Sequence, residues 1–264
     1  MMHNRIVIKV GSNVLTRPDG KLDITRLSAI VDQIAYLRQQ GYEIILVSSG
    51  AMASGRGEFA RVDQRIRLGH SLDSVEQRQL FSAIGQVKLI GLYYDLFREF
   101  GIHVGQVLTM KENFNAGEQY ENQRACMNVM LENGVLPIVN ENDTVAVTEL
   151  MFTDNDELSG LIAQMMQAET LILLSNIDGI FTTHPDDPKA ELIREVAPGR
   201  DLSEYIQPEK SAFGRGGMHS KYTTARKTSQ AGIRVIIANG ERENILIDLI
   251  KRKDDTPHTV FIPK

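Results

Sequence analysis

The stretch IVNENDTVAVTELMFTDNDELSGLIA, from Ile138 to Ala163, decides the fold of this 264-residue chain. It holds two polar clusters, NEND at 140–143 and DND at 154–156. The first follows VLPIV at 135–139, a run typical of a buried strand, so it should lie at the carboxyl end, where open α/β sheets bind ligands. The second precedes apolar residues at helical spacing, where Asp154 or Asn155 fits a helix cap. A turn and a cap explain either cluster alone, whereas the two together favour a binding site.

Outward from this stretch, strands and helices alternate along the chain. The expected strands cover residues 5–10, 43–47, 102–108, 135–139, 170–174, 233–238 and 259–262. The expected helices cover 25–40, 75–100 with interruptions at two glycines, 118–131, a segment after 156, and a segment ending near 231. Residues 48–53 are expected to form a small-residue turn, and 57–73 an exposed loop. This order predicts an α/β fold with an open, mostly parallel sheet flanked by helices on both faces.

Composition narrows the class of ligand. Hydrophobic residues make up 42% of the chain, and the net charge of −5 comes without a basic tract, which argues against nucleic acid and favours a small molecule. The N-terminus lacks the apolar length of a signal peptide, and no run is long enough to span a membrane, so we expect a cytoplasmic protein. The single cysteine, Cys126, has no partner for an internal disulfide and is expected to pack in the core.

Two segments have features of phosphate sites. Lys9 interrupts the apolar strand RIVIKV and precedes Gly11 and Ser12, so it must either meet an anion or reach out to solvent; we favour the anion. The segment FGRGGMHSK at 213–221 places glycines before a helix and Lys221 one turn into it, as in a phosphate cradle, although a flexible loop would also be rich in glycine. Residues 50–57 lack the Lys-Ser/Thr of a P-loop.

These segments together resemble the amino acid kinase family, and within it the members that phosphorylate glutamate. The matching motifs are IVIKVGS at 6–12, LVSSGAMASGR at 46–56, GIHVGQVL at 101–108, IVNENDTV at 138–145, DNDELS at 154–159 and GGMHSK at 216–221. The resemblance implies transfer of the γ-phosphoryl group of MgATP to the side-chain carboxylate of L-glutamate, which yields the first intermediate of proline synthesis. It also implies one domain over 1–264, with the glutamate site in about 1–168 and the ATP site in about 169–264.

The resemblance also implies a role for individual residues. The implied glutamate contacts are Ser49, Gly50, Asp143 and Asn155. The implied nucleotide contacts are Lys9, Gly11, Ser12, Ser175, Asn176, Arg215, Gly216, Gly217, Met218, His219, Ser220 and Lys221. The implied catalytic residues are Lys9 and Lys221, together with Asp156, which would hold both lysines. No metal cage of protein ligands is expected, because Mg²⁺ usually binds the substrate phosphates and water.

The sequence departs from the family pattern at three points, and two alternative functions are considered. Compared with the family pattern, Thr153 replaces a glycine before the DND cluster, and Arg215 replaces a small hydroxyl residue. We also expect no counterpart of the C-terminal PUA domain that many members carry. We further expect a homo-oligomer, with glutamyl phosphate reductase as a candidate partner.

One alternative function is that of another acyl-phosphate-forming amino acid kinase, although a substrate with a free α-amine best explains Asp143. The other is a non-catalytic amino-acid or nucleotide sensor, which the presence of both lysines argues against.

Overall fold

One eight-stranded sheet forms the centre of the molecule. The computed structural model describes residues 4–62, 73–146, 152, 154–206, 217–253 and 255–264. The strands are β1 Arg5–Val10, β2 Glu43–Ser48, β3 Val104–Thr109, β4 Leu136–Glu141, β5 Thr170–Ser175, β6 Glu195–Val196, β7 Arg234–Asn239 and β8 His258–Phe261. Their order is β3-β4-β2-β1-β5-β7-β8-β6, and only the β7–β8 pair is antiparallel. The open, mostly parallel sheet is therefore confirmed.

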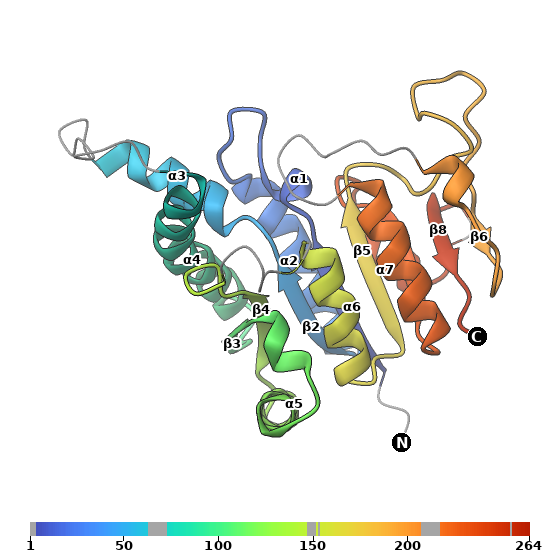
Figure 1. Ribbon diagram of the computed structural model, residues 1–264. Coiled ribbons are helices and arrows are strands. Elements are labelled where there is room, and N and C mark those ends of the chain that lie inside the picture. Colours follow the sequence, from blue (N-terminus) through green and yellow to red (C-terminus); the bar gives the residue numbers. More distant parts are fainter. Residues whose placement is uncertain (1–3, 63–72, 147–151, 153, 207–216, 254) are drawn as a thin grey trace.

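Helices cover both faces of this sheet. They are α1 Ser12–Leu15, α2 Ile24–Gln39, α3 Ala51–Val62, α4 Ser74–Arg98, α5 Glu118–Glu132, α6 Asn155–Met165, α7 Met218–Gln230 and α8 Ile245–Ile250, with 3₁₀ turns η1 Lys111–Phe114 and η2 Ser203–Tyr205. One core cluster joins α2, α4 and α8 to the sheet, and a second joins α6 and α7 to it. Figure 1 shows α6 and α7 together on one side of the sheet, with α2 behind it.

The alternation of side chains along β1 places Lys9 on the face of the sheet that α6 and α7 cover. Ile6 and Ile8 belong to the core cluster on the α2 face, whereas Val7 belongs to the cluster on the opposite face. Successive side chains of a strand point to opposite faces, so Lys9 shares the face of Val7. A charged group is thereby directed toward the first turns of α6 and α7.

Three local expectations were wrong. Residues 51–62 form helix α3 rather than a turn and loop, and α4 runs unbroken through Gly85 and Gly91. Tertiary packing explains α3 and the passage of α4 through Gly85. A Cβ at Gly55 would lie 1.7 Å from the carbonyl oxygen of Phe81, and one at Gly85 would lie 1.7 Å from that of Ala51, so the two helices pack backbone to backbone. Cys126 is exposed, because α5 buries Met127 and turns its neighbour outward.

Candidate functional site

A cavity of about 430 Å³ opens at the carboxyl ends of β1, β2, β4 and β5. The chain proceeds from β1 to β2 on one side and later returns to β5 on the other side of β1. Such a reversal of strand order leaves a crevice, which is where open α/β sheets bind ligands. The predicted residues that line the cavity are Lys9, Gly11, Ser12, Ser49, Gly50, Asp143, Asn155, Ser175 and Lys221.

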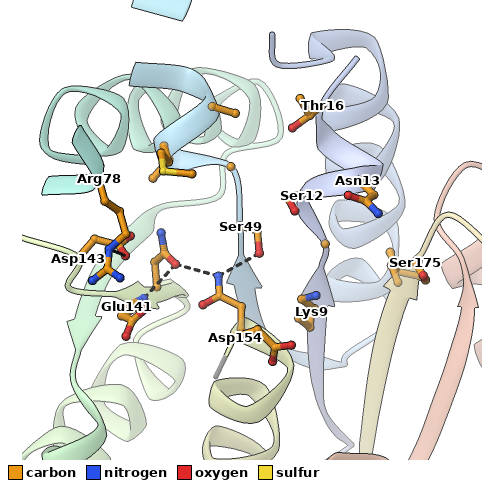
Figure 2. A pocket seen from close by; sticks show the side chains of 18 of the residues that line it. Lys9, Ser12, Asn13, Thr16, Ser49, Arg78, Glu141, Asp143, Asp154 and Ser175 are labelled. Atoms are coloured by element: carbon orange, nitrogen blue, oxygen red, sulfur yellow. Dashed lines mark hydrogen bonds and ion pairs between the residues drawn. The ribbon is translucent and has the colours of Figure 1, made fainter. Parts of the chain in front are cut away.

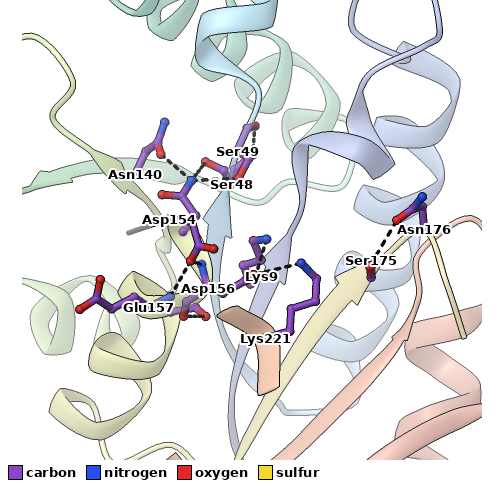
Figure 3. A network of polar contacts seen from close by, with 12 residues as sticks. Lys9, Ser48, Ser49, Asn140, Asp154, Asp156, Glu157, Ser175, Asn176 and Lys221 are labelled. Atoms are coloured by element: carbon purple, nitrogen blue, oxygen red, sulfur yellow. Dashed lines mark hydrogen bonds and ion pairs between the residues drawn. The ribbon is translucent and has the colours of Figure 1, made fainter. Parts of the chain in front are cut away.

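Two lysines that line this cavity meet one buried carboxylate, Asp156, which is not itself a lining residue. Lys9 Nζ lies 2.5 Å from Asp156 Oδ1, and Lys221 Nζ lies 3.0 Å from Asp156 Oδ2. All three residues are buried, with Asp156 completely so. Figure 3 shows the lysines approaching from β1 and α7, while Asp156 belongs to the first turn of α6. The triad that the sequence predicted is therefore assembled from three distant segments.

Burial and charge act in opposite directions on the triad. Burial alone would raise the pKa of Asp156, but the adjacent Lys221 and Lys9 outweigh it and hold that pKa below its ordinary value. Burial lowers the pKa of Lys9, since the attraction of Asp156 does not fully compensate for lost hydration. Asp156 is therefore ionised at neutral pH and acts as a counter-ion, so it has no proton to donate.

A cap and two glycines fix the triad. Asp154 Oδ1 accepts hydrogen bonds from the backbone N–H groups of Asp156 and Glu157, at 2.9 and 3.1 Å, so Asp154 is the cap of α6. A Cβ at Gly160 would lie 2.8 Å from Thr228 Oγ1, so this glycine lets α6 and α7 approach closely. A Cβ at Gly11 would lie 3.3 Å from Lys9 Nζ. The small residues therefore make room for the lysines.

An amide cluster lies beside the triad. Asn155 Nδ2 donates to Asn140 Oδ1 at 2.9 Å and to Ser49 Oγ at 3.0 Å. Asn140 Nδ2 in turn donates to Gln86 Oε1 at 2.9 Å. These bonds connect the end of β2, the end of β4, the start of α6 and the middle of α4. Both polar clusters of the opening stretch thus meet at one site.

An ion pair closes the other end of the cavity. Arg78 Nε lies 3.3 Å from Asp143 Oδ1, and the two side chains are 15% and 14% exposed. Arg78 also donates through Nη2 to the carbonyl oxygen of Ala146. In Figure 2 the pair lies on one side of the cavity, and Lys9 and Ser175 lie on the other.

Some predicted contacts lie away from the cavity. Asn176 accepts a hydrogen bond from Ser175 Oγ at 3.4 Å, but it is not a lining residue. Gly217 precedes α7, and Met218, His219 and Ser220 form its first turn without lining the cavity. Arg215, Gly216 and Thr153 lie outside the described residues.

Sequence reasoning missed several lining residues, of which Arg56, Arg78, Glu141 and Asp154 are charged. Arg78 stands in a helix recognised only by its apolar spacing, which gives no reason to single out one polar position. Glu141 belongs to the NEND cluster, where Asp143 alone was selected. It is buried, and its Oε1 accepts a hydrogen bond from the backbone N–H of Phe152 at 2.9 Å.

The described residues hold neither a cluster of three or more metal-binding side chains nor a helix long and apolar enough to cross a membrane.

Comparison with known proteins identifies relatives of this chain and of its fold. The chain is 64% identical over 259 residues to a protein named glutamate 5-kinase from Bacteroides thetaiotaomicron, covering 98% of this chain and 70% of that protein. It is 37% identical over 265 residues to the protein of the same name from Clostridium acetobutylicum, covering 99% and 95%. Both relatives therefore match nearly the whole chain.

Solved structures share the fold at much lower identity. Carbamate kinase from Giardia lamblia bound to AMP-PNP superposes with a TM-score of 0.68 at 15% identity, covering 100% of this chain and 99% of that one. UMP kinase from Ureaplasma parvum gives 0.65 at 16%, covering 99% and 100%. The sequence model of the amino acid kinase family matches residues 4–239. With the fold, the sequence relatives and the family match in agreement, the chain belongs to the amino acid kinase family.

Proposed function

We propose that this protein transfers the γ-phosphoryl group of ATP to the side-chain carboxylate of L-glutamate, giving L-glutamyl 5-phosphate for proline biosynthesis. The observation that carries the proposal is that Lys9 and Lys221, which line the same cavity as Asn155 and Asp143, both pair with the buried Asp156. Relatives named glutamate 5-kinase at 64% and 37% identity support the same substrate.

The two lysines supply what this reaction most needs. A carboxylate and a triphosphate are both anions, and two like charges about 4 Å apart repel by roughly 4 kcal/mol at an effective dielectric near 20. With both lysines protonated, Lys9, Lys221 and Asp156 carry a net charge of +1, so the group attracts the transferring phosphoryl. The attacking carboxylate is already ionised at neutral pH, so the site needs no general base.

The nucleotide side of the cavity lies near β5 and α7. Ser175 ends β5 and lines the cavity, and the N-terminus of α7 presents backbone N–H groups that suit phosphate. Asp154 is the described carboxylate that best fits Mg²⁺: it lines the cavity, and its Oδ2 is buried with no hydrogen-bond partner. When bound, Mg²⁺ would neutralise phosphate charge.

The glutamate side of the cavity lies between β2 and β4. Ser49 and Asn155 offer a hydroxyl and an amide, and Gly50 adopts φ +102°, a conformation that favours glycine, where the backbone lines the cavity. Asp143 lines the cavity, and its carboxylate suits the α-ammonium group. Residues about 1–168 would thus bind the amino acid, and about 169–264 most of the nucleotide.

The reaction itself gives the first test. Incubation with ATP, Mg²⁺ and L-glutamate is expected to form ADP together with an acyl phosphate that hydroxylamine traps as a hydroxamate. N-acetylglutamate, aspartate and carbamate serve as competing acceptors in the same assay. Equal or faster turnover of any of these three would contradict the assignment to glutamate.

Asp143→Asn tests the amino-acid end. An ammonium partner remote from the reacting carboxylate binds ground state and transition state alike, so its loss appears in KM. We expect a higher KM for glutamate, an almost unchanged KM for ATP, and a fall in kcat/KM of about ten- to a hundredfold, corresponding to roughly 1.5–3 kcal/mol.

Asp32→Asn, on the exposed face of α2, is the matched control for the same chemical change. If Asp143 served only to hold Arg78, its replacement would lower the melting temperature and leave KM for glutamate unchanged. Measuring both quantities on one preparation separates the two roles.

A further inference from the structure

The pair of Arg78 with Asp143 differs from the surface ion pairs of the same helix. Arg98 and Asp95, also on α4, lie 3.9 Å apart and are 61% and 67% exposed. Arg78 and Asp143 are about four times less exposed, and both line the cavity. Partial burial makes their charges matter more to a ligand, because water screens them less.

The other cations of the cavity have different surroundings. Among the described lining residues the positive side chains are Lys9, Arg56, Arg78 and Lys221. The two lysines are paired with Asp156 at the phosphoryl-transfer end. Arg56 is exposed, and its guanidinium lies 5.7 Å from the ring centre of Phe81. Arg78 is therefore the cation held beside Asp143.

The first turns of α4 fix this arginine in place. Asp73 caps the helix in a capping box with Glu76, and Gln79 Nε2 donates to the carbonyl oxygen of Thr144 at 2.9 Å. Arg78 itself donates to the carbonyl oxygen of Ala146. The start of α4 is thus bound to the turn that carries Asp143, so the two charges are presented together at a fixed separation.

An α-amino acid carries two neighbouring charges that are complementary to those of Arg78 and Asp143. Its ammonium and its carboxylate are bonded to the same carbon, so two adjacent opposite charges on the protein can each meet a partner at once. We infer that Arg78 binds the α-carboxylate of the substrate while Asp143 binds its α-ammonium group, an inference that rests on the proposed function. The planar guanidinium suits a carboxylate, which it can engage through two N–H donors.

This arrangement makes the pair a specificity determinant. A substrate without the α-carboxylate charge offers Arg78 no charged partner, so Arg78 pairs with Asp143 alone. A substrate with an acylated amine offers Asp143 no ammonium partner, so Asp143 pairs with Arg78 alone. Either change loses one charge-assisted contact and keeps the reacting carboxylate. The site therefore selects free α-amino acids rather than dicarboxylates in general.

The test compares L-glutamate with L-glutamic acid α-amide, in which a neutral carboxamide of similar size replaces the α-carboxylate. The parent protein is expected to prefer glutamate by about ten- to a hundredfold in kcat/KM, the worth of one charged hydrogen bond. Arg78→Met should bring the two substrates to within about threefold of each other by losing activity on glutamate while keeping its activity on the amide.

The ratio of kcat/KM for L-glutamate to kcat/KM for the α-amide shows whether Arg78 binds the substrate or only stabilises the fold. If Arg78 only held the turn, Arg78→Met would slow both substrates alike, and an unchanged ratio would overturn the inference, as would a parent protein that does not discriminate. Arg98→Met on the same helix is the matched control and should keep the parent ratio. If Arg78→Met does not fold, Arg78→Lys replaces it, because lysine keeps the positive charge but lacks the paired N–H donors of the guanidinium. The ratio of kcat/KM for glutamate to kcat/KM for the α-amide should then fall at least threefold. An unchanged ratio again overturns the inference.

A binding measurement distinguishes failure of the inference about Arg78 from failure of the proposed function. Absence of glutamate turnover by the parent would contradict the proposed function. Thermal stabilisation without ATP then decides the inference: L-glutamate should raise the melting temperature of the parent more than the α-amide does, and Arg78→Met should remove that difference. Equal stabilisation of the parent by both compounds would overturn the role of Arg78.

Discussion

Lys221→Ala is expected to lower kcat by about a hundredfold or more, the usual effect of removing one preorganised electrostatic contact from a transition state. Lys221 is buried in the first turn of α7, and its ammonium is held 3.0 Å from Asp156 rather than in water. Its charge therefore faces the cavity without having to reorganise during the reaction. Without it, the group of Lys9 and Asp156 loses its net positive charge.

Steady-state kinetics with saturating ATP and glutamate measure this effect. Lys227→Ala is the matched control, because Lys227 lies in the last turn of the same helix and is exposed. Circular dichroism and the melting temperature of each variant establish that it is folded. A folded Lys221→Ala variant with kcat within about threefold of the parent would show that this lysine does not assist the transfer.

The sequence was sufficient for most of the fold because its buried strands are short apolar runs bounded by clear breaks. The first strand was predicted at 5–10 and observed at Arg5–Val10, and the strand before the NEND cluster was displaced by only one or two residues. The errors lie where packing overrides local preference. Helix α3 begins among small residues that suggest a turn, and its close contact with α4 cannot be read from either segment alone.

For the site, the family resemblance predicted that both lysines pair with Asp156, whereas the residue patterns alone did not. Lys9 and Lys221 were identified by their positions at a strand end and a helix start. Their joint attachment to Asp156 depends on the close approach of α6 and α7 at Gly160, which no local pattern encodes. Arg78 was missed for the same reason, because its importance comes from its contact with the turn that carries Asp143.

Asp156→Asn is expected to have the largest effect on stability. The change leaves two buried ammonium groups without their counter-ion, and breaking a buried pair in this way costs about 3–5 kcal/mol. For a chain of this size that corresponds to a fall in melting temperature of about 10 °C. Chemical denaturation at pH 7 measures the free energy of unfolding, and a difference below about 1 kcal/mol would contradict the role of Asp156 as the counter-ion of the lysines.

The pH dependence and a second variant test the same role. Because the folded protein holds the pKa of Asp156 below its ordinary value of 3.8, its stabilising contribution is complete above that value and disappears as pH falls through the lower folded pKa. The stability difference between parent and Asp156→Asn should therefore be constant near neutrality and shrink below about pH 4. Combining Asp156→Asn with Lys9→Met returns the net charge of the group from +2 to the parental +1. The double variant should then recover part of the lost stability and none of the lost activity, because charge balance is restored while a lysine proposed to stabilise the transferring phosphoryl group is gone.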